Sequence, residues 1–199
     1  MPSYAVVLAD NDPQWPERYR AEAARIRAAL GGWIEQIEHV GSTAVPGLAA
    51  KPIIDIAVGV RRLADAERCI EPLERIGYAY RPGAEVMVPD RRFFQKGGSV
   101  AREFHVHVVD VRGPDWERWL LFRDYLRAHP EKAREYERLK RTLASCHRDN
   151  RAYTAQKTAF IEAAVAEAGA AKARLEEAGS RIAPHGSTLE YRGRPPKRG

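Results

Sequence analysis

The chain has 199 residues, of which 44% are hydrophobic, and this length and composition indicate one ordinary domain with a real core rather than a disordered chain. Its only cysteines, Cys69 and Cys146, lie far apart in the sequence, which argues against a disulfide framework and favours a reducing cytoplasm. The sequence contains neither a run of roughly 20 apolar residues, as a membrane span requires, nor a signal-peptide pattern. We therefore expect a soluble, cytoplasmic protein that makes no membrane contact.

The net charge of +6 at pH 7 is concentrated at the C-terminus. Residues 181–199 hold five basic residues against Glu190 alone, which accounts for +4 of the total and leaves +2 for the first 180 residues. Basic segments of this composition are typical of disordered, solubilising tails. Nucleic acid is therefore expected to bind, if at all, only through this tail.

In the first half of the chain, helices and strands are predicted to alternate. The helices show apolar residues at helical spacing and end at glycines, whereas the last strand is β-branched and bounded by proline and glycine. The predicted strands are 4–8, 33–40 and 52–60, and the predicted helices are 17–30 and 63–77, the second with a kink at Pro72.

The second half changes from a strand meander to long helices. The predicted strands are 78–82, 85–89, 91–97 and 102–110, and the predicted helices are 114–128, 130–146 and 150–168. This order favours an α+β fold with a helical cap. We expect an α+β core at 1–112, helices packed on it at 113–169, and a helix extension with a disordered basic tail at 170–199.

Two of the predicted strands carry polar residues on one face. Side chains alternate along a strand, so Asp55 lies beside the small residue Ala57, while Glu103, His105 and His107 share the face opposite their apolar neighbours. A lone acid in an apolar strand is costly without a partner, and two histidines so spaced can bind one metal ion or donate to a phosphate. Alternatively, Asp55 caps a helix or pairs with an arginine, and the histidines form an exposed polar face.

The turn between these strand signals is a candidate anion site. Gly41 permits close approach of the backbone, Ser42 and Thr43 offer hydroxyl groups, and a helix beginning here would aim amide groups at an anion. Serine and threonine next to glycine are also ordinary turn residues.

Several cationic or polar side chains could bind the same ligand. Lys51 directly precedes the strand of Asp55, and Arg91 begins a stretch in which arginine adjoins aromatic residues. Tyr153 and Lys157 share one helical face, from which Lys157 either reaches the site or extends its amine to water. Arg123 is a weaker candidate of the same kind. For each cation, a solvated surface position is the alternative.

Several segments resemble the GrpB family, a branch of the nucleotidyltransferase superfamily, over about residues 4–168. They are "EHVGSTAVPGLAAKPIIDI", "RRFF", "HVHVV", "FRDYLRAHP" and "YTAQKTAFI". The resemblance implies a nucleotidyltransferase-like mixed sheet flanked by helices. It also implies that Gly41 and Ser42 hold nucleotide phosphates and that Asp55 is the first of two paired acids. The second acid is replaced by Ala57, and a third acid by His105 or His107.

The replacement of the second and third acids affects which metal cofactor the site can hold. Bridging carboxylates normally offset the repulsion between two divalent ions, and magnesium prefers oxygen ligands whereas imidazole suits zinc or manganese. We expect at most one divalent ion (Mg, Mn or Zn), held by Asp55, His105 and His107, with Glu103 as a candidate fourth ligand. A metal-free site in which the histidines contact the ligand directly is the alternative.

The function that the resemblance implies is nucleotidyl or phosphoryl transfer from a phosphate-containing small molecule or nucleotide. The catalytic candidates are Asp55, His105, His107 and Lys157, and the ligand-binding candidates are Gly41, Ser42, Thr43, Lys51, Arg91 and Tyr153. Two alternatives stay open because the second acid is missing: a non-catalytic ligand-binding or folding module, and an enzyme of other chemistry that uses the same pocket.

Overall fold

A mixed five-stranded sheet forms the centre of the protein. The computed structural model describes residues 7–86, 88–98, 102–146 and 154–182. The strand order is β1-β2-β5-β4-β3, with β2 and β5 parallel and the other pairs antiparallel. The strands are β1 (Gln36–Val40), β2 (Ile54–Val60), β3 (Ala79–Tyr80), β4 (Arg91–Gly97) and β5 (Arg102–Asp110). The α+β prediction is confirmed.

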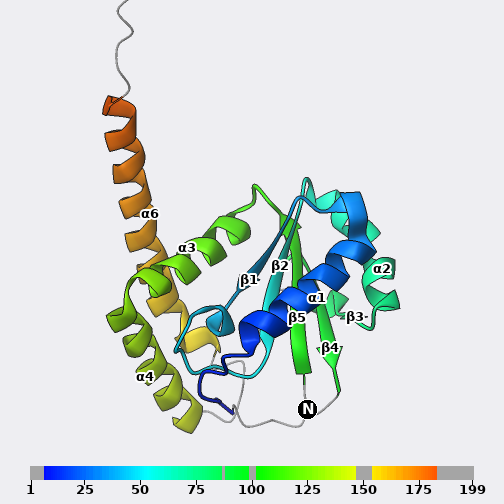
Figure 1. Ribbon diagram of the computed structural model, residues 1–199, viewed down its shortest axis with the longest axis horizontal. Coiled ribbons are helices and arrows are strands. Elements are labelled where there is room, and N and C mark those ends of the chain that lie inside the picture. The colour runs from blue at the N-terminus through cyan, green and yellow to red at the C-terminus, as the bar shows by residue number, and fades with distance from the viewer. Residues whose placement is uncertain (1–6, 87, 99–101, 147–153, 183–199) are drawn as a thin grey trace, which may run out of the picture.

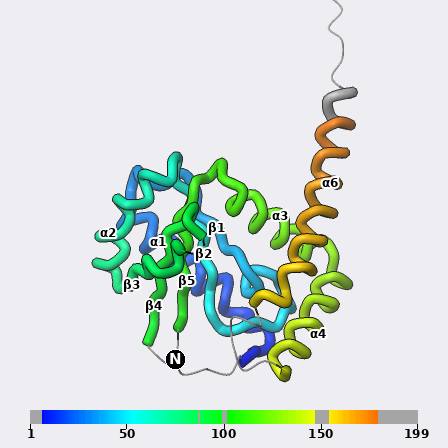
Figure 2. The backbone as a smooth tube through the Cα atoms, turned by 180° about the vertical axis from the view of Figure 1, so that it is seen from behind, coloured from blue at the N-terminus to red at the C-terminus, as the bar shows by residue number. Residues whose placement is uncertain are grey.

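Helices cover both faces of the sheet. Figure 1 shows α1 (Trp15–Leu30) crossing one face, with α2 (Ile70–Arg75) beside it. On the other side lie α3 (Pro114–Ala128), α4 (Pro130–Cys146) and α6 (Thr158–Ile182), and α6 extends away from the rest of the protein in both views (Figures 1 and 2).

The alternation of side chains in β2 divides the core into two layers. Ile54, Ile56 and Val58 are fully buried in the cluster that α1 and α2 complete. On the opposite face, Ala57 packs with Trp116 of α3 in a smaller apolar cluster. Asp55 follows the same alternation, so it lies on the side of the sheet that α3 covers.

A third apolar cluster fixes the loop between β1 and β2. Val45 and Leu48 from this loop pack against Tyr125 of α3, Tyr136 of α4 and Ala164 of α6. The C-terminal helices therefore hold the segment that leads into the strand of Asp55.

Several predicted boundaries differ from the structure. The predicted helix 63–77 divides into a 3-10 helix (Leu63–Cys69) and α2, where Pro72 lies in the first turn and so breaks no internal hydrogen bond. The prediction of a strand at 85–89 was wrong for the residues that the structure describes there, because they follow a 3-10 turn and form no ladder. The last helix, α6, begins at Thr158 and runs to Ile182.

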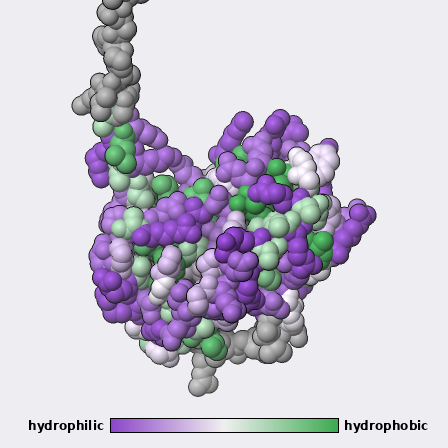
Figure 3. All heavy atoms as spheres, in the orientation of Figure 1, coloured by the Kyte–Doolittle hydropathy of each residue, from purple (hydrophilic) through white to green (hydrophobic). Residues whose placement is uncertain are grey.

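Other predictions concern segments beyond the described residues. Residues 4–6 of the first predicted strand and the tail from residue 183 onward lie outside them, while Ala9 forms an isolated bridge with Ala50. Hydrophilic residues cover most of the face seen in Figure 3. None of the helices in the described ranges combines the length and apolar character needed to cross a bilayer.

Candidate functional site

Asp55, His105 and His107 converge on one face of the sheet. The parallel register pairs Asp55 with His105 and Ala57 with His107. The Asp55 Oδ1 atom lies 3.2 Å from His105 Nδ1 and 3.9 Å from His107 Nε2. Candidate ligand atoms from all three residues lie within 4.8 Å of one another. The side chains are 32%, 17% and 14% exposed, so the cluster is recessed but reachable from solvent.

The electrostatics of this cluster favour a charged carboxylate beside a neutral imidazole. Burial alone would raise the pKa of Asp55, but hydrogen bonding to the two histidines outweighs burial and holds this pKa well below its usual range. Burial lowers the pKa of His107, and the attraction of Asp55 only partly opposes this effect. An ionised carboxylate and a neutral imidazole are the protonation states in which these groups bind metal ions.

Aromatic contacts hold the histidine rings in place. Phe93 of β4 stacks on His107 with ring centroids 4.9 Å apart and meets the edge of His105 at 5.1 Å. Trp119 of α3 lies 5.3 Å from His107. His105 Nε2 and His107 Nδ1 are buried without a hydrogen-bond partner among the described residues. Each ring therefore has one nitrogen near Asp55 and one buried nitrogen without a partner among the described residues.

The Gly41 bend packs directly against the carboxylate of Asp55. Gly41 has a φ of +71°, and a Cβ atom placed there would lie 2.5 Å from Asp55 Oδ2. Both the backbone conformation and the close approach require glycine. The bend opens a single turn of 3-10 helix, Ser42–Ala44, rather than a long helix. Gly41 thus lies against the carboxylate of the cluster, and Ser42 follows it in the bend.

Thr43 is brought near the bend but has a different set of contacts. It is 3% exposed, and its hydroxyl lies 2.9 Å from His39 Nε2. The same hydroxyl donates a weak hydrogen bond to the carbonyl of Ile53 at 3.5 Å. These contacts give Thr43 a role in holding the bend rather than in binding a ligand.

Two lysines lie close enough to Asp55 to interact with its charge. Burial lowers the pKa of Lys51, and Asp55 opposes this change. Burial and the charge of Lys51 lower the pKa of Lys157 to about 8, again opposed by Asp55. Both predicted lysines therefore lie within electrostatic range of Asp55.

Glu103, the predicted fourth metal ligand, is not part of the cluster. The pairing of β4 with β5 jumps from Lys96–Phe104 to Gly97–Arg102, which leaves Glu103 without an opposite residue. Such a bulge re-aims the side chain of the extra residue. The Glu103 carboxylate lies 3.3 Å from Arg18 Nη2 of α1 and is 55% exposed. Tyr153, a predicted ligand-binding residue, lies outside the described residues.

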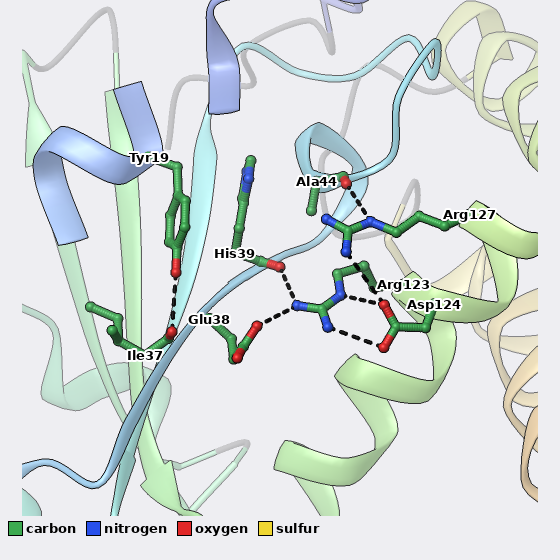
Figure 4. Close-up of polar contacts among 8 residues, drawn as sticks. All are labelled: Tyr19, Ile37, Glu38, His39, Ala44, Arg123, Asp124 and Arg127. Atoms are coloured by element: carbon green, nitrogen blue, oxygen red, sulfur yellow. Dashed lines mark hydrogen bonds and ion pairs between the residues drawn. The ribbon is translucent and has the colours of Figure 1, made fainter. Parts of the chain in front are cut away.

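A set of contacts that the sequence did not predict fastens the bend to α3 (Figure 4). Arg123 Nη1 donates to Glu38 Oε2 at 2.6 Å and to the carbonyl of His39 at 3.0 Å. Arg127, one helical turn later, donates to the carbonyl of Ala44 at 2.9 Å. The i, i+4 spacing of these arginines was a visible signal, but it did not reveal their partners in β1 and the bend.

The comparisons with known proteins identify the family. The family model described as GrpB protein matches residues 5–167. The chain belongs to the GrpB family. The predicted resemblance over residues 4–168 is thereby confirmed, and every candidate site residue from Gly41 to Lys157 lies within the match.

Relatives within the GrpB family cover the same part of the chain. The UPF0157 protein PA4798 of Pseudomonas aeruginosa is 46% identical over 154 residues, which are 75% of this chain and 62% of that protein. The UPF0157 protein YqkA of Bacillus subtilis is 42% identical over 149 residues, which are 75% of this chain and 43% of that protein. The chain therefore spans less than two thirds of the length of either relative.

A solved structure supports the fold. The crystal structure of conserved protein GrpB from Enterococcus faecalis matches with a TM-score of 0.73 and 37% sequence identity. The match covers 81% of this chain and 96% of that chain. The mixed sheet with flanking helices is thus a feature shared with a GrpB protein.

Proposed function

We propose that this GrpB protein binds a phosphate-containing small molecule through one divalent ion and transfers a nucleotidyl or phosphoryl group from it. The observation that carries the proposal is the convergence of Asp55, His105 and His107 next to the Gly41 bend. Lys51 and Lys157 would add positive charge, since the pKa of each responds to the charge of Asp55.

The donor set fits one borderline metal ion better than magnesium. It offers one carboxylate oxygen and two imidazole nitrogens; imidazole suits zinc or iron, and the carboxylate also suits manganese. When bound, such an ion would polarise a phosphoryl oxygen and offset its charge. The ionised Asp55 supplies the negative charge that retains the ion.

The residues of the chain would perform the remaining steps. Lys51 and Lys157 would offset the charge of the phosphate, and the close approach of Gly41 to Asp55 brings the backbone of the bend to the cluster. Phe93 and Trp119 would fix the histidine rings and limit the entry of water. Positioning and charge compensation are the main requirements of phosphoryl transfer.

The test is the release of pyrophosphate from nucleoside triphosphates in the presence of Mn²⁺ or Zn²⁺. We expect turnover by the wild type and a decrease of about 100-fold or more in Asp55→Asn, because that substitution removes the charge that organises the site. Asp65→Asn is the matched control, since Asp65 pairs with Arg62 in a 3-10 helix away from the cluster. Equal turnover in wild type and Asp55→Asn would contradict the proposal.

One observation favours a second function, a non-catalytic ligand-binding module. Ala57 is 1% exposed and packed against Trp116, so the residue that would carry the second acid of a two-ion site belongs to an apolar cluster. This reading predicts that nucleotides raise the melting temperature of wild type and Asp55→Asn alike, with no release of pyrophosphate from either.

A further inference from the structure

The candidate site has a single cluster that could hold a metal ion. The proposed ligand, a phosphate compound, carries several negative charges. Among the described residues, Asp55, His105 and His107 form the only group of three side chains suited to a metal ion. Ala57 lies in the apolar cluster with Val40, Val109 and Trp116, so nothing at that position can bind a second ion. In two-ion enzymes the second ion shares the work of stabilising phosphate charge. With only one ion, a positively charged side chain must stabilise the remaining phosphate charge here.

Arg91 lies on the correct face of the sheet. In the antiparallel pairing of β4 with β5, Phe93 is opposite His107 and Arg91 is opposite Val109. Arg91 therefore projects on the same side as Phe93, toward α3. Its Cζ atom lies 5.9 Å from the ring centre of Trp119, the residue whose ring is 5.3 Å from His107. Arg91 and His107 thus approach the same tryptophan.

The hydrogen bonding of Arg91 is incomplete. Its Nε atom is buried and has no hydrogen-bond partner among the described residues. The neighbouring Arg92, on the other face of β4, pairs with Glu67 at 2.6 Å and with Glu85 at 3.4 Å. Leaving a buried guanidinium N–H without an acceptor costs free energy, so an unmet donor of this kind needs an explanation.

The two histidines of the cluster each carry one further buried polar atom. His105 Nε2 and His107 Nδ1 are the other buried side-chain atoms that have no partner in the described part of the chain. If the ring nitrogens near Asp55 bind an ion, these second nitrogens carry hydrogen and can only donate. Arg91 Nε and both imidazoles would then present three donors and no acceptor.

The pKa shifts of Arg91 and His107 agree with the placement of Arg91 on this face of the sheet. Burial lowers the pKa of Arg91, and Asp115 and Asp55 oppose that change. The charge of Arg91 in turn contributes to the lowered pKa of His107. Arginine stays protonated under these conditions, so Arg91 is a permanent positive charge within range of Asp55 and His107.

We propose that Arg91 binds a second anionic group of the ligand and takes the place of a second metal ion at this site. The proposal rests on the proposed function, and it deepens it by naming the ligand class: a small molecule with two linked anionic groups, such as a diphosphate. One group would lie at the ion and the lysines, and the other would accept hydrogen bonds from Arg91 and from the second ring nitrogens of the histidines.

The experiment compares the binding of inorganic pyrophosphate and inorganic phosphate by calorimetry, with and without Mn²⁺. The wild type is expected to prefer pyrophosphate. In Arg91→Gln we expect the affinity for pyrophosphate to fall about 10- to 100-fold, because one hydrogen bond to a charged group contributes about that much binding free energy. The preference for pyrophosphate over phosphate should then disappear. Arg91→Lys should lie in between, because lysine keeps the charge but loses the planar arrangement of donors.

Controls separate this inference from the proposed function. Arg92→Gln changes the same residue type on the opposite face of β4 and should bind pyrophosphate as the wild type does. Mn²⁺ uptake should be one ion per chain in Arg91→Gln and in Arg92→Gln. Unchanged pyrophosphate affinity in Arg91→Gln, or uptake of a second Mn²⁺ ion by the wild type, would overturn the inference. Absence of both Mn²⁺ and Zn²⁺ uptake in the wild type would overturn the proposed function, whereas a loss of metal-free pyrophosphate binding in Arg91→Gln would still support Arg91 as the anion site.

Discussion

His39 links the Gly41 bend to the far side of the sheet. Its ring is 6% exposed, stacks on Tyr19 of α1 at 4.7 Å and contacts the hydroxyl of Thr43 through Nε2. Burial, with smaller effects from Arg127 and Arg123, lowers the pKa of His39 to about 4, although Asp55 opposes the change. His39 is therefore neutral in the folded protein at neutral pH.

This shift predicts a loss of stability in mild acid. An unfolded histidine takes up a proton near pH 6.5, whereas folded His39 does so only near pH 4, so the unfolded state binds more protons between these values. The free energy of unfolding should therefore fall as pH decreases from 6.5 to 4, by up to about 3 kcal/mol from His39 alone. His107, whose pKa is also lowered, adds a change of the same sign.

His39→Gln tests the assignment to His39. Glutamine keeps a polar group that can meet the Thr43 hydroxyl but does not titrate. Urea unfolding of the metal-free protein at several pH values should show a smaller fall between pH 6.5 and 4 in His39→Gln than in the wild type. An identical fall in the two proteins would contradict this account of His39.

At the scale of the elements, the parallel pairing of β2 and β5 creates the site. Strand alternation in the sequence was enough to predict that Asp55 shares a face with small residues, and that His105 and His107 share a face opposite their apolar neighbours. The sequence did not show that the two strands are adjacent, because β3 and β4 intervene along the chain. It also could not show the bulge at Glu103, since an unpaired residue leaves no mark on the pattern of apolar residues.

The packing of α3 on β2 lets us predict the effect of placing the missing second acid at position 57. In Ala57→Asp, a carboxylate would enter the apolar cluster around Trp116 without a partner, and we expect a loss of about 3 kcal/mol or more in the free energy of unfolding. The variant should not gain a second metal ion. Ala57→Ser, similar in size and uncharged, should lose far less in urea unfolding at pH 7. A stable Ala57→Asp that binds two ions would contradict our view of this position.

At the scale of the whole molecule, the C-terminal helices complete the site. Tyr125 of α3, Tyr136 of α4 and Ala164 of α6 pack on the loop that leads to β2. Lys140 of α4, which is 2% exposed, also donates to the carbonyl of Ala49 in that loop. The helical periodicity of the sequence predicted these helices, but not which of their side chains reach the loop.

The molecule divides into a part shared with the GrpB family and a part beyond it. The family match ends at residue 167, so the outer half of α6 lies outside the shared region. Because that region contains Asp55, both histidines and Arg91, the proposed chemistry belongs to the shared part of the chain.

The metal site can be tested by counting metal ions per chain after equilibration with Mn²⁺ or Zn²⁺ and removal of the unbound metal. We expect one ion per chain in the wild type and in Glu103→Gln, because Glu103 lies away from the cluster. We expect close to none in His105→Ala and in Asp55→Asn, each of which removes one ligand. Equal metal content in the wild type and His105→Ala would show that Asp55, His105 and His107 do not form a metal site.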